Sequence, residues 1–319
     1  MNRNWLAKAP AVLAAAVLIL GTGVAHAQLL AGRRMLQVFG GANDGSGENG
    51  HMALAGSMML TPKGGAKAVN VTVVYQDSKN DADGFVCTFT DPSDVAYSFP
   101  NGLNSVGTLT LTLAADDPPC FEMTNPKATG KETGGSVTFV VYRQPGAFAL
   151  LGDKSTLIDA DSDTVSSLAL SGTLTPAASI PKNRLGGIAL FNALGGTTDT
   201  SSLHSDSGHL ALAGRAALTP KGAAKSLDLT LSYIDSDNDN FVCELTDPTD
   251  LSYSISKGVG SLTLKVGAND SATCPNSVGE SITFTLYSAG AQTRLIATSS
   301  SLADSFGDVI GSVAMAGSM

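Results

Sequence analysis

Residues 227–233 read Leu-Asp-Leu-Thr-Leu-Ser-Tyr, so apolar and polar side chains alternate along this stretch. Similar alternation occurs at residues 70–75, 108–113 and 262–266, with Thr at many of the polar positions. A period of two puts successive side chains on opposite faces of a strand, one face buried and one in water. Clusters of Gly, Asn, Asp and Pro separate these runs. We therefore expect an all-β protein made of antiparallel sheets.

The sequence is internally duplicated. Residues 51–56, His-Met-Ala-Leu-Ala-Gly, recur at 209–214 as His-Leu-Ala-Leu-Ala-Gly. Residues 90–94, Thr-Asp-Pro-Ser-Asp, recur at 246–250 as Thr-Asp-Pro-Thr-Asp, and other matched pairs follow in the same order. The offset between copies drifts from 158 residues at the His to 154 at the second Cys, as loop insertions would produce. We predict two tandem homologous antiparallel β-sandwich domains, immunoglobulin-like or jelly-roll-like, with a closed barrel as the structural alternative.

The N-terminus has the three parts of a secretory signal. A short basic start carries Arg3 and Lys8, an apolar core follows, and Ala25-His26-Ala27 forms a cleavage site. The apolar run is too short to span a bilayer comfortably. The predicted divisions are a signal peptide at 1–27, an apolar segment with a Gly-rich tether at 28–50, repeat 1 at 51–180, a linker with a leading strand at 181–208, and repeat 2 at 209–319. We expect export in a bacterium, to the periplasm, the cell surface or the medium, with no membrane span in the mature chain.

The composition is acidic and favours turns. Of the 319 residues, 23 are Asp and 5 are Glu, and the net charge of −9 becomes −11 once the signal peptide is removed. Asp suits turns and caps, whereas Glu suits helix interiors. General binding to nucleic acid or to an anionic membrane needs clustered positive charge, so the sequence argues against both kinds of partner.

Four cysteines lie at matched positions in the two copies. An exported chain meets an oxidising compartment, and no C-x-x-C motif suggests a metal or redox site. Duplication favours pairing within each copy over the other two connectivities. The predicted disulfides are Cys87–Cys120 and Cys243–Cys274.

Closely spaced aspartates precede Phe85 and Phe241, at two predicted hairpin tips. Ca²⁺ takes six to eight oxygen ligands, many of them carboxylates. Each disulfide would bring the loop before its second Cys close to the same hairpin tip, and oxygens of that loop would then lie beside the aspartates of the tip. Asp91, Asp94 and their counterparts are expected at the opposite end of the domain. The alternative is that these residues only make soluble turns. No cofactor is required, but calcium is a candidate, with these predicted ligands: Asp77, Asp81, Asp83, Asp116, Asp117, Asp235, Asp237, Asp239 and Asp270.

No pattern in the sequence indicates an enzyme. His51 and His209 are matched, but neither occurs within a G-x-S-x-G, H-E-x-x-H or Gly-rich phosphate-binding motif. A structural role at the end of a strand explains both histidines better than catalysis does. We therefore expect a non-enzymatic protein.

Two other functional classes remain. The first is a structural or adhesive cell-surface or extracellular protein, a matrix or filament subunit that binds itself or cell-surface components. Residues Met35, Leu36, Val38 and Phe39 would then form an apolar assembly strand that completes the sheet of a neighbouring subunit. The alternative for that strand is pairing within its own domain. The second class is a carbohydrate- or ligand-binding β-sandwich module that depends on calcium, although a mature chain without Trp is unusual for a sugar site.

Overall fold

The computed structural model describes most of the chain beyond the N-terminal 29 residues. The described residues are 30–43, 49–77, 84–100, 106–114, 117–118, 120–122, 134–158, 163–178, 184–200, 207–235, 240–270 and 274–319. No helix in these ranges has the length and apolarity needed to cross a bilayer.

Each repeat is built on one long antiparallel sheet. The sheet of repeat 1 contains, in spatial order, β5 (Val95–Ser98), β6 (Gly107–Thr112), β8 (Ser136–Gln144), β9 (Ala147–Ser155), β12 (Ser167–Pro176), β1 (Gly32–Asn43), β2 (Asn49–Leu60), β3 (Ala66–Asp77), β4 (Phe85–Phe89) and β7 (Phe121–Glu122). The sheet of repeat 2 contains β16 (Asn240–Leu245), β15 (Ala224–Asp235), β14 (Ser207–Leu218), β13 (Gly187–Thr200), β22 (Val309–Ser318), β20 (Gln292–Ser300), β19 (Ser281–Ala289), β18 (Val259–Lys265) and β17 (Leu251–Ser256), with β21 (Leu302–Ala303) pairing β22. The short strands β10 (Leu157–Ile158) and β11 (Thr164–Val165) pair with each other.

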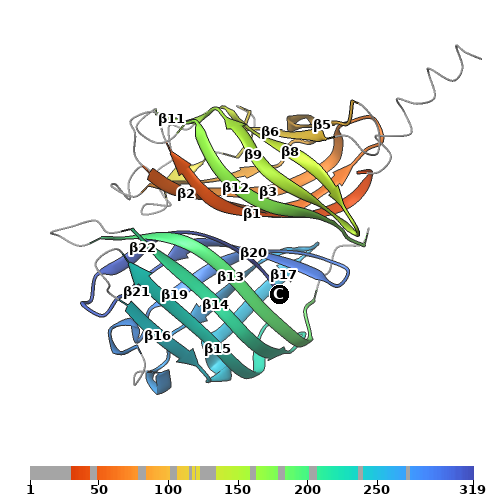
Figure 1. Cartoon of the computed structure of the whole chain (residues 1–319). Coiled ribbons are helices and arrows are strands. Elements are labelled where there is room, and N and C mark those ends of the chain that lie inside the picture. Colours follow the sequence, from red (N-terminus) through yellow and green to blue (C-terminus); the bar gives the residue numbers. More distant parts are fainter. Residues whose placement is uncertain are drawn as a thin grey trace, which may run out of the picture.

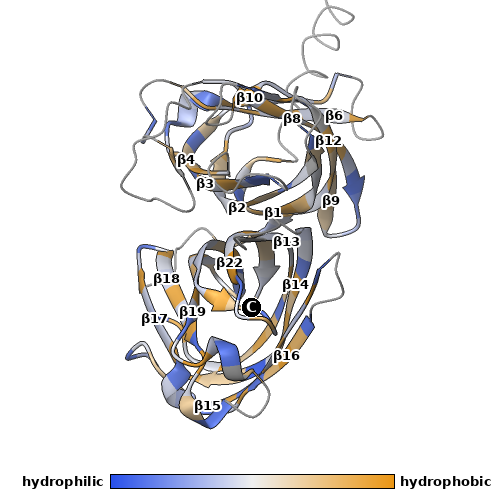
Figure 2. Ribbon diagram, turned by 90° about the vertical axis from the view of Figure 1, so that its left-hand side faces the viewer, coloured by the Kyte–Doolittle hydropathy of each residue, from blue (hydrophilic) through white to orange (hydrophobic). Residues whose placement is uncertain are grey.

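Both sheets curl strongly, so that their two halves face each other over one core (Figure 1; Figure 2). In each repeat one end strand of the sheet approaches the turn between two other strands, β2 and β3 in repeat 1 and β14 and β15 in repeat 2. There, the backbone N–H of Tyr97 in β5 donates to the carbonyl of Gly64 (2.7 Å), and that of Tyr253 in β17 donates to the carbonyl of Gly222 (2.8 Å). The chain is therefore all-β, and the expected two tandem antiparallel β-sandwich domains are confirmed.

The matched Thr-Asp-Pro motifs form matched turns. Pro92–Asp94 and Pro248–Asp250 are single 3-10 turns, called η2 and η3, that lead into β5 and β17. In each turn an Asp at the N-cap accepts a hydrogen bond from the backbone N–H two residues later, at 2.7 Å for Asp91 and 2.9 Å for Asp247. A short acidic side chain satisfies such an N–H well, and Pro at the first position lacks one to satisfy.

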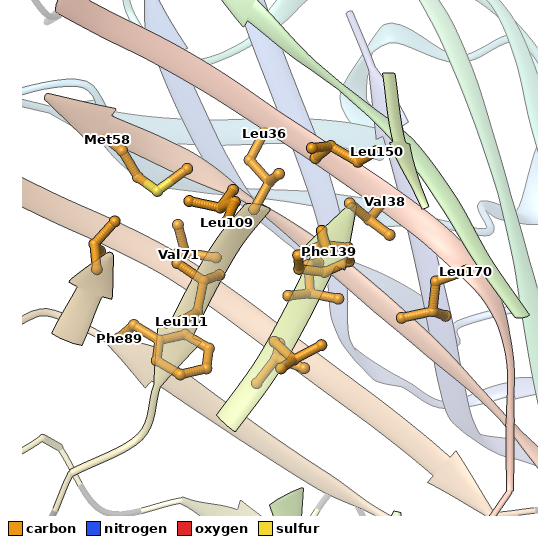
Figure 3. Close-up of a cluster of buried hydrophobic side chains, with 14 of the residues drawn as sticks. Leu36, Val38, Met58, Val71, Phe89, Leu109, Leu111, Phe139, Leu150 and Leu170 are labelled. Carbon is orange, nitrogen blue, oxygen red and sulfur yellow. The ribbon is translucent and has the colours of Figure 1, made fainter. Parts of the chain in front are cut away.

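The core of each repeat consists of the inward side chains of its strands. In repeat 1 these include Leu36, Val38 and Met58 from β1 and β2, and Leu109, Phe139 and Leu150 from the other half of the sheet (Figure 3). Repeat 2 has the equivalent cluster around Leu212, Leu262 and Phe284. The alternating pattern thus places one face of every long strand in a core, as expected from the sequence.

The leading strands are central members of their sheets. β1 pairs with β12 on one side and with β2 on the other, and β13 pairs with β14 and β22. The described strands within the segments 28–50 and 181–208 therefore belong to the sheets of the repeats, and Gly40 and Gly41 of the expected tether lie within β1.

In this structure the segment predicted as an assembly strand, Met35, Leu36, Val38 and Phe39, pairs within its own repeat. β1 is hydrogen-bonded along both edges to strands of its own repeat. A strand whose backbone groups are already paired on both sides offers none for a neighbour's sheet. The alternative, pairing within its own domain, is the one observed.

Both expected disulfides are present. Cys87 in β4 is bonded to Cys120, and Cys243 in β16 is bonded to Cys274, with Cα–Cα distances of 4.4 and 5.2 Å. Structural disulfides persist in oxidising compartments and are rare in reducing ones, so the folded chain belongs to a non-cytoplasmic compartment.

Replacing Cys87 and Cys120 together by Ser should destabilise the protein by about 3–4 kcal/mol, the loop-closure value for a bridge across 33 residues. Urea unfolding of the oxidised proteins measures this loss. The variant Cys243→Ser/Cys274→Ser should behave alike, because its bridge spans 31 residues. An unchanged unfolding midpoint in either variant would contradict the structural role of the bridge.

Candidate functional site

Two of the predicted calcium ligands are buried at the ends of strands. Asp77 ends β3 and Asp235 ends β15, and each accepts a hydrogen bond from the Tyr two residues earlier. The Tyr75 hydroxyl lies 3.1 Å from Asp77 Oδ2, and the Tyr233 hydroxyl lies 3.3 Å from Asp235 Oδ2. The other predicted ligands near these tips, Asp81, Asp83, Asp116, Asp237 and Asp239, lie outside the described residues.

Asp117 and Asp270 do not join those tips, which corrects the sequence prediction. Asp117 Oδ1 accepts the backbone N–H of Thr90 (2.9 Å), and Asp270 Oδ1 accepts that of Thr246 (3.4 Å). Thr90 and Thr246 follow β4 and β16 at the end remote from the acidic tips. Asp77 is about seven residues along the ladder from that end, or roughly 20 Å. Cys87 and Cys243 lie inside β4 and β16. A bridge from the middle of a strand therefore allows the loop that carries the second Cys to run toward either end of that strand.

The acidic residues at the far end of repeat 2 form a compact group. Asp250 is only 7% exposed, and its carboxylate faces that of Asp270, while Asp247 accepts a hydrogen bond from the Asn269 amide at 2.9 Å. Burial, and then the adjacent Asp270 carboxyl, raise the pKa of Asp250 to about 6. A raised pKa means that this carboxyl shares or keeps a proton at mildly acidic pH.

Metal binding by the described residues has no geometric support. Within the part of the chain that the structure describes, no three His, Cys, Asp or Glu side chains are grouped as metal ligands. The described members of the predicted calcium set fall at two opposite ends of each repeat, and protein donors already bond to them.

A different feature is prominent: the two repeats are joined face to face. The outer side of β1, β2, β3 and β4 lies against the outer side of β19, β20 and β22, and β13 adjoins the same contact (Figure 1). The side chains at this contact are small or apolar, and they form a third buried cluster in addition to the two cores. Its buried members are Met35, Ala53, Ala55, Val74 and Val86 from repeat 1 and Tyr287, Ala289, Ile296, Ala314 and Ala316 from repeat 2.

A chain of hydroxyl groups crosses the middle of this contact. The Tyr287 hydroxyl lies 2.5 Å from Thr72 Oγ1, which lies 3.2 Å from Thr88 Oγ1. Burial raises the pKa of Tyr287 to about 12, although the bond to Thr72 opposes the shift. Tyr287 therefore stays protonated at any physiological pH and has a hydrogen-bonding partner in an otherwise apolar contact, as a buried hydroxyl requires.

The matched histidines meet at one edge of the contact. The rings of His51 and His209 are 5.4 Å apart in an edge-to-face arrangement, and the His51 ring also stacks on Phe39. His51 Nδ1 lies 3.2 Å from Gln76 Oε1, and Gln76 in turn donates to Thr198 of repeat 2. Burial lowers the pKa of His51, the Gln76 hydrogen bond opposes this shift, and His209 lowers it further. The surroundings of His51 thus favour the neutral form of its ring.

Polar contacts close the opposite edge. Thr175 of repeat 1 donates to Gln292 Oε1 (2.6 Å) and accepts from the Arg294 guanidinium (2.9 Å), while the Gln292 amide donates to the Pro176 carbonyl (2.6 Å). With apolar packing at the centre and hydrogen bonds at both edges, the two repeats are held as one unit.

Sequence reasoning missed this contact, although a signal for it was present. Ala53, Ala55, Val74 and Val86 occupy outward positions, where alternation alone predicts polar side chains. Val74 in particular breaks the alternation of β3. An apolar residue on the solvent face of a strand is the expected mark of a partner on that face.

Comparisons with known proteins give little guidance. No family model matches the chain, and no curated protein matches it. A crystal structure of a protein provisionally assigned as AttH, from Nitrosomonas europaea, aligns with 91% of this chain and 92% of its own, with 6% sequence identity and a TM-score of 0.31. That similarity is too low to support an argument about fold or function.

Replacing Asp250 by Asn should increase stability at neutral and alkaline pH. A folded-state pKa near 6, above the ordinary value of 3.8, means that the native protein binds more protons than the unfolded chain between those values. The contribution of Asp250 to stability is therefore fully present below pH 4 and is lost as pH rises through 6. Asn keeps the shape without the charge.

Urea unfolding at pH 4, 6 and 8 tests this expectation. The advantage of Asp250→Asn should be larger at pH 8 than at pH 4, whereas Asp153→Asn, at an exposed position of repeat 1, should change little. An Asp250→Asn variant that is less stable than the natural chain at pH 8 would refute the assignment.

Gly196 and Gly41 offer a matched test of the His51 packing. A Cβ at Gly196 would lie 2.0 Å from His51 Cγ, whereas a Cβ at its counterpart Gly41 meets nothing nearer than 3.9 Å. Gly196→Ala should therefore displace the His51 ring and cost about 1–3 kcal/mol through overpacking. Gly41→Ala should be close to neutral. Thermal unfolding of both variants checks the difference, and equal melting temperatures would contradict the contact.

Proposed function

We propose that this chain is an exported, non-enzymatic structural or adhesive protein of the bacterial cell surface or extracellular matrix. The observation that carries the proposal is the contact between the repeats. Met35, Ala53, Ala55, Tyr287 and Ile296 are at most 1% exposed there, on sheet faces that are usually in water. Such burial turns two domains into one stiff unit, which suits a load-bearing or spacing role.

The disulfides agree with work outside the cytoplasm. Each bridge pins a short strand, β4 or β16, to a neighbouring loop. Cross-links of this kind form and persist in oxidising compartments outside the cytoplasm. Assembly by strand addition is not part of this proposal, because β1 is already paired on both sides.

A ligand-binding module is the alternative, and one observation favours it. A groove of about 280 Å³ lies between the repeats. Its walls carry amide and hydroxyl side chains from both repeats, including Gln37, Thr173 and Asn192, beside the apolar Phe39 and Leu194. Polar groups beside an apolar surface suit a carbohydrate or another small polar ligand. Calcium at the aspartates of the two hairpin tips would belong to this alternative.

Fractionation of the source cells, followed by labelled electron microscopy, tests the principal proposal. We expect the mature protein outside the inner membrane, in surface-attached or extracellular assemblies. Recovery solely as a dissolved periplasmic protein would overturn it. A glycan array tests the alternative: binding that is lost on replacing Asn192 by Ala and kept on replacing Asn276, an exposed residue that does not line the groove, would favour a ligand-binding module.

A further inference from the structure

We propose that a second copy of this chain docks on the outer face of repeat 2, repeating between chains the contact that joins the two repeats within one chain. The front face of a repeat is the outer side of β1–β4 in repeat 1 and of β13–β16 in repeat 2. The back face is the outer side of β8, β9 and β12 in repeat 1 and of β19, β20 and β22 in repeat 2. Within the chain, the front face of repeat 1 covers the back face of repeat 2 and also contacts the end of β13 that carries Gly196 and Thr198. The inference rests on the proposed structural role and names the partner.

The two front faces correspond residue by residue. Strand register places Ala53 opposite Val74 and Val74 opposite Val86 in repeat 1. In repeat 2 it places Ala211 opposite Ser232 and Ser232 opposite Val242. Two residues further along the strands, Ala55 lies opposite Thr72 in repeat 1 and Ala213 lies opposite Thr230 in repeat 2, so Thr230 occupies the position of Thr72.

The two back faces correspond equally well. Ile296 pairs with Ala316 in repeat 2, and Leu151 pairs with Ser171 in repeat 1. Tyr287 pairs with Arg294, and its counterpart Tyr142 pairs with Ala149. A constant offset of 145 residues relates every one of these positions.

Matched residues are buried where a repeat covers them and exposed where none does. Tyr287 and Ile296 are 1% and 0% exposed, whereas Tyr142 and Leu151 are 41% and 47% exposed. On the front faces, Val86 is 3% exposed and Val242 is 52% exposed. The front face of repeat 2 and the back face of repeat 1 are thus apolar copies of surfaces that the same molecule buries.

These two uncovered faces hold most of the exposed apolar bulk of the described chain. Twelve large hydrophobic residues are exposed, and seven of them lie on the two faces. The five on the front face of repeat 2 are Ile188, Leu190, Leu194, Ile234 and Val242, and the two on the back face of repeat 1 are Tyr142 and Leu151. Concentrated apolar surface of this kind marks an interaction site.

The central hydrogen bond of the contact can also be repeated. Within the chain, the Tyr287 hydroxyl bonds to Thr72 Oγ1. The matched groups, Tyr142 on the back face of repeat 1 and Thr230 on the front face of repeat 2, are both exposed. In the proposed contact, Tyr142 of one chain meets Thr230 of the next. Ser171 and Ser232 stand where the internal contact has Ala316 and Val74, so we expect the contact between chains to be weaker than the internal one.

The contact joins two different faces, so it is heterologous. Such a contact forms a ring if the rotation closes and an open chain if it does not. The two uncovered faces border the same groove, lined by Ser171 and Thr173 of repeat 1 and by Asn192 and Leu194 of repeat 2. A closed dimer with two identical contacts is therefore the smallest assembly that covers every face, and a filament is the open form.

Sedimentation velocity of the mature chain over a range of concentrations, with two charge variants, tests the proposal. The natural chain should increase in mean mass with concentration. Val242→Lys, which blocks the front face of repeat 2, and Leu151→Lys, which blocks the back face of repeat 1, should each weaken association at least about tenfold. Phe306→Lys, at a 75% exposed apolar residue outside both faces, should associate normally. Unchanged melting temperatures would show that all three variants fold.

Mixing the two blocked variants gives the decisive result. Each retains the face that the other lacks, so an equal mixture should form a 1:1 dimer through the one intact contact, at concentrations where neither variant associates alone. A natural chain that stays monomeric at every concentration, or a Leu151→Lys variant that still associates with itself, would overturn the proposal. If the chain associates as described but is found only as a dissolved periplasmic protein, the proposed function is refuted and this contact is not. Surface assemblies that persist with Val242→Lys would refute the contact but not the function.

Discussion

The burial of two outer sheet faces against each other is the constraint on which the rest of this structure depends. An antiparallel sheet ordinarily covers one face with its own core and leaves the other to water. Here small side chains such as Ala53 and Ala55 let the sheets approach closely, and Tyr287 fills the remaining space while keeping a partner for its hydroxyl. Hydrogen bonds at both edges of the contact add to this apolar packing and hold the two repeats in one arrangement.

The same contact makes two similar repeats inequivalent. Val86 and Val242 occupy one position of the fold, yet the first is covered and the second is open to solvent. Gln76, buried at the edge of the contact, bonds across to Thr198, whereas its counterpart Ile234 has no repeat against it. A heterologous contact between two copies always leaves one face of each kind uncovered, which is why the exposed apolar residues collect on two surfaces.

Five of the described aspartates bond to backbone N–H groups nearby. Asp91 and Asp247 cap short turns, Asp117 and Asp270 accept backbone N–H groups from the neighbouring loop, and Asp304 accepts three such groups. A carboxylate on a single methylene reaches the backbone nearby, whereas the longer Glu side chain does so less readily. These five aspartates thus organise turns and loops next to the strands.

The sequence by itself determined the strands, the duplication and the disulfide pairs, because each depends on short-range pattern or on matched spacing. Alternation at residues 227–233 fixes which side chains face a core, and duplication selects Cys87–Cys120 among the possible pairings. The placement of Asp117 was not predictable, since a bridge in the middle of a five-residue strand leaves the direction of its partner loop open. Only the tertiary structure decided that His51 meets His209 and that β1 is an inner strand. Both depend on which sheet faces and edges come together across long stretches of chain, and a local pattern carries no information about that choice.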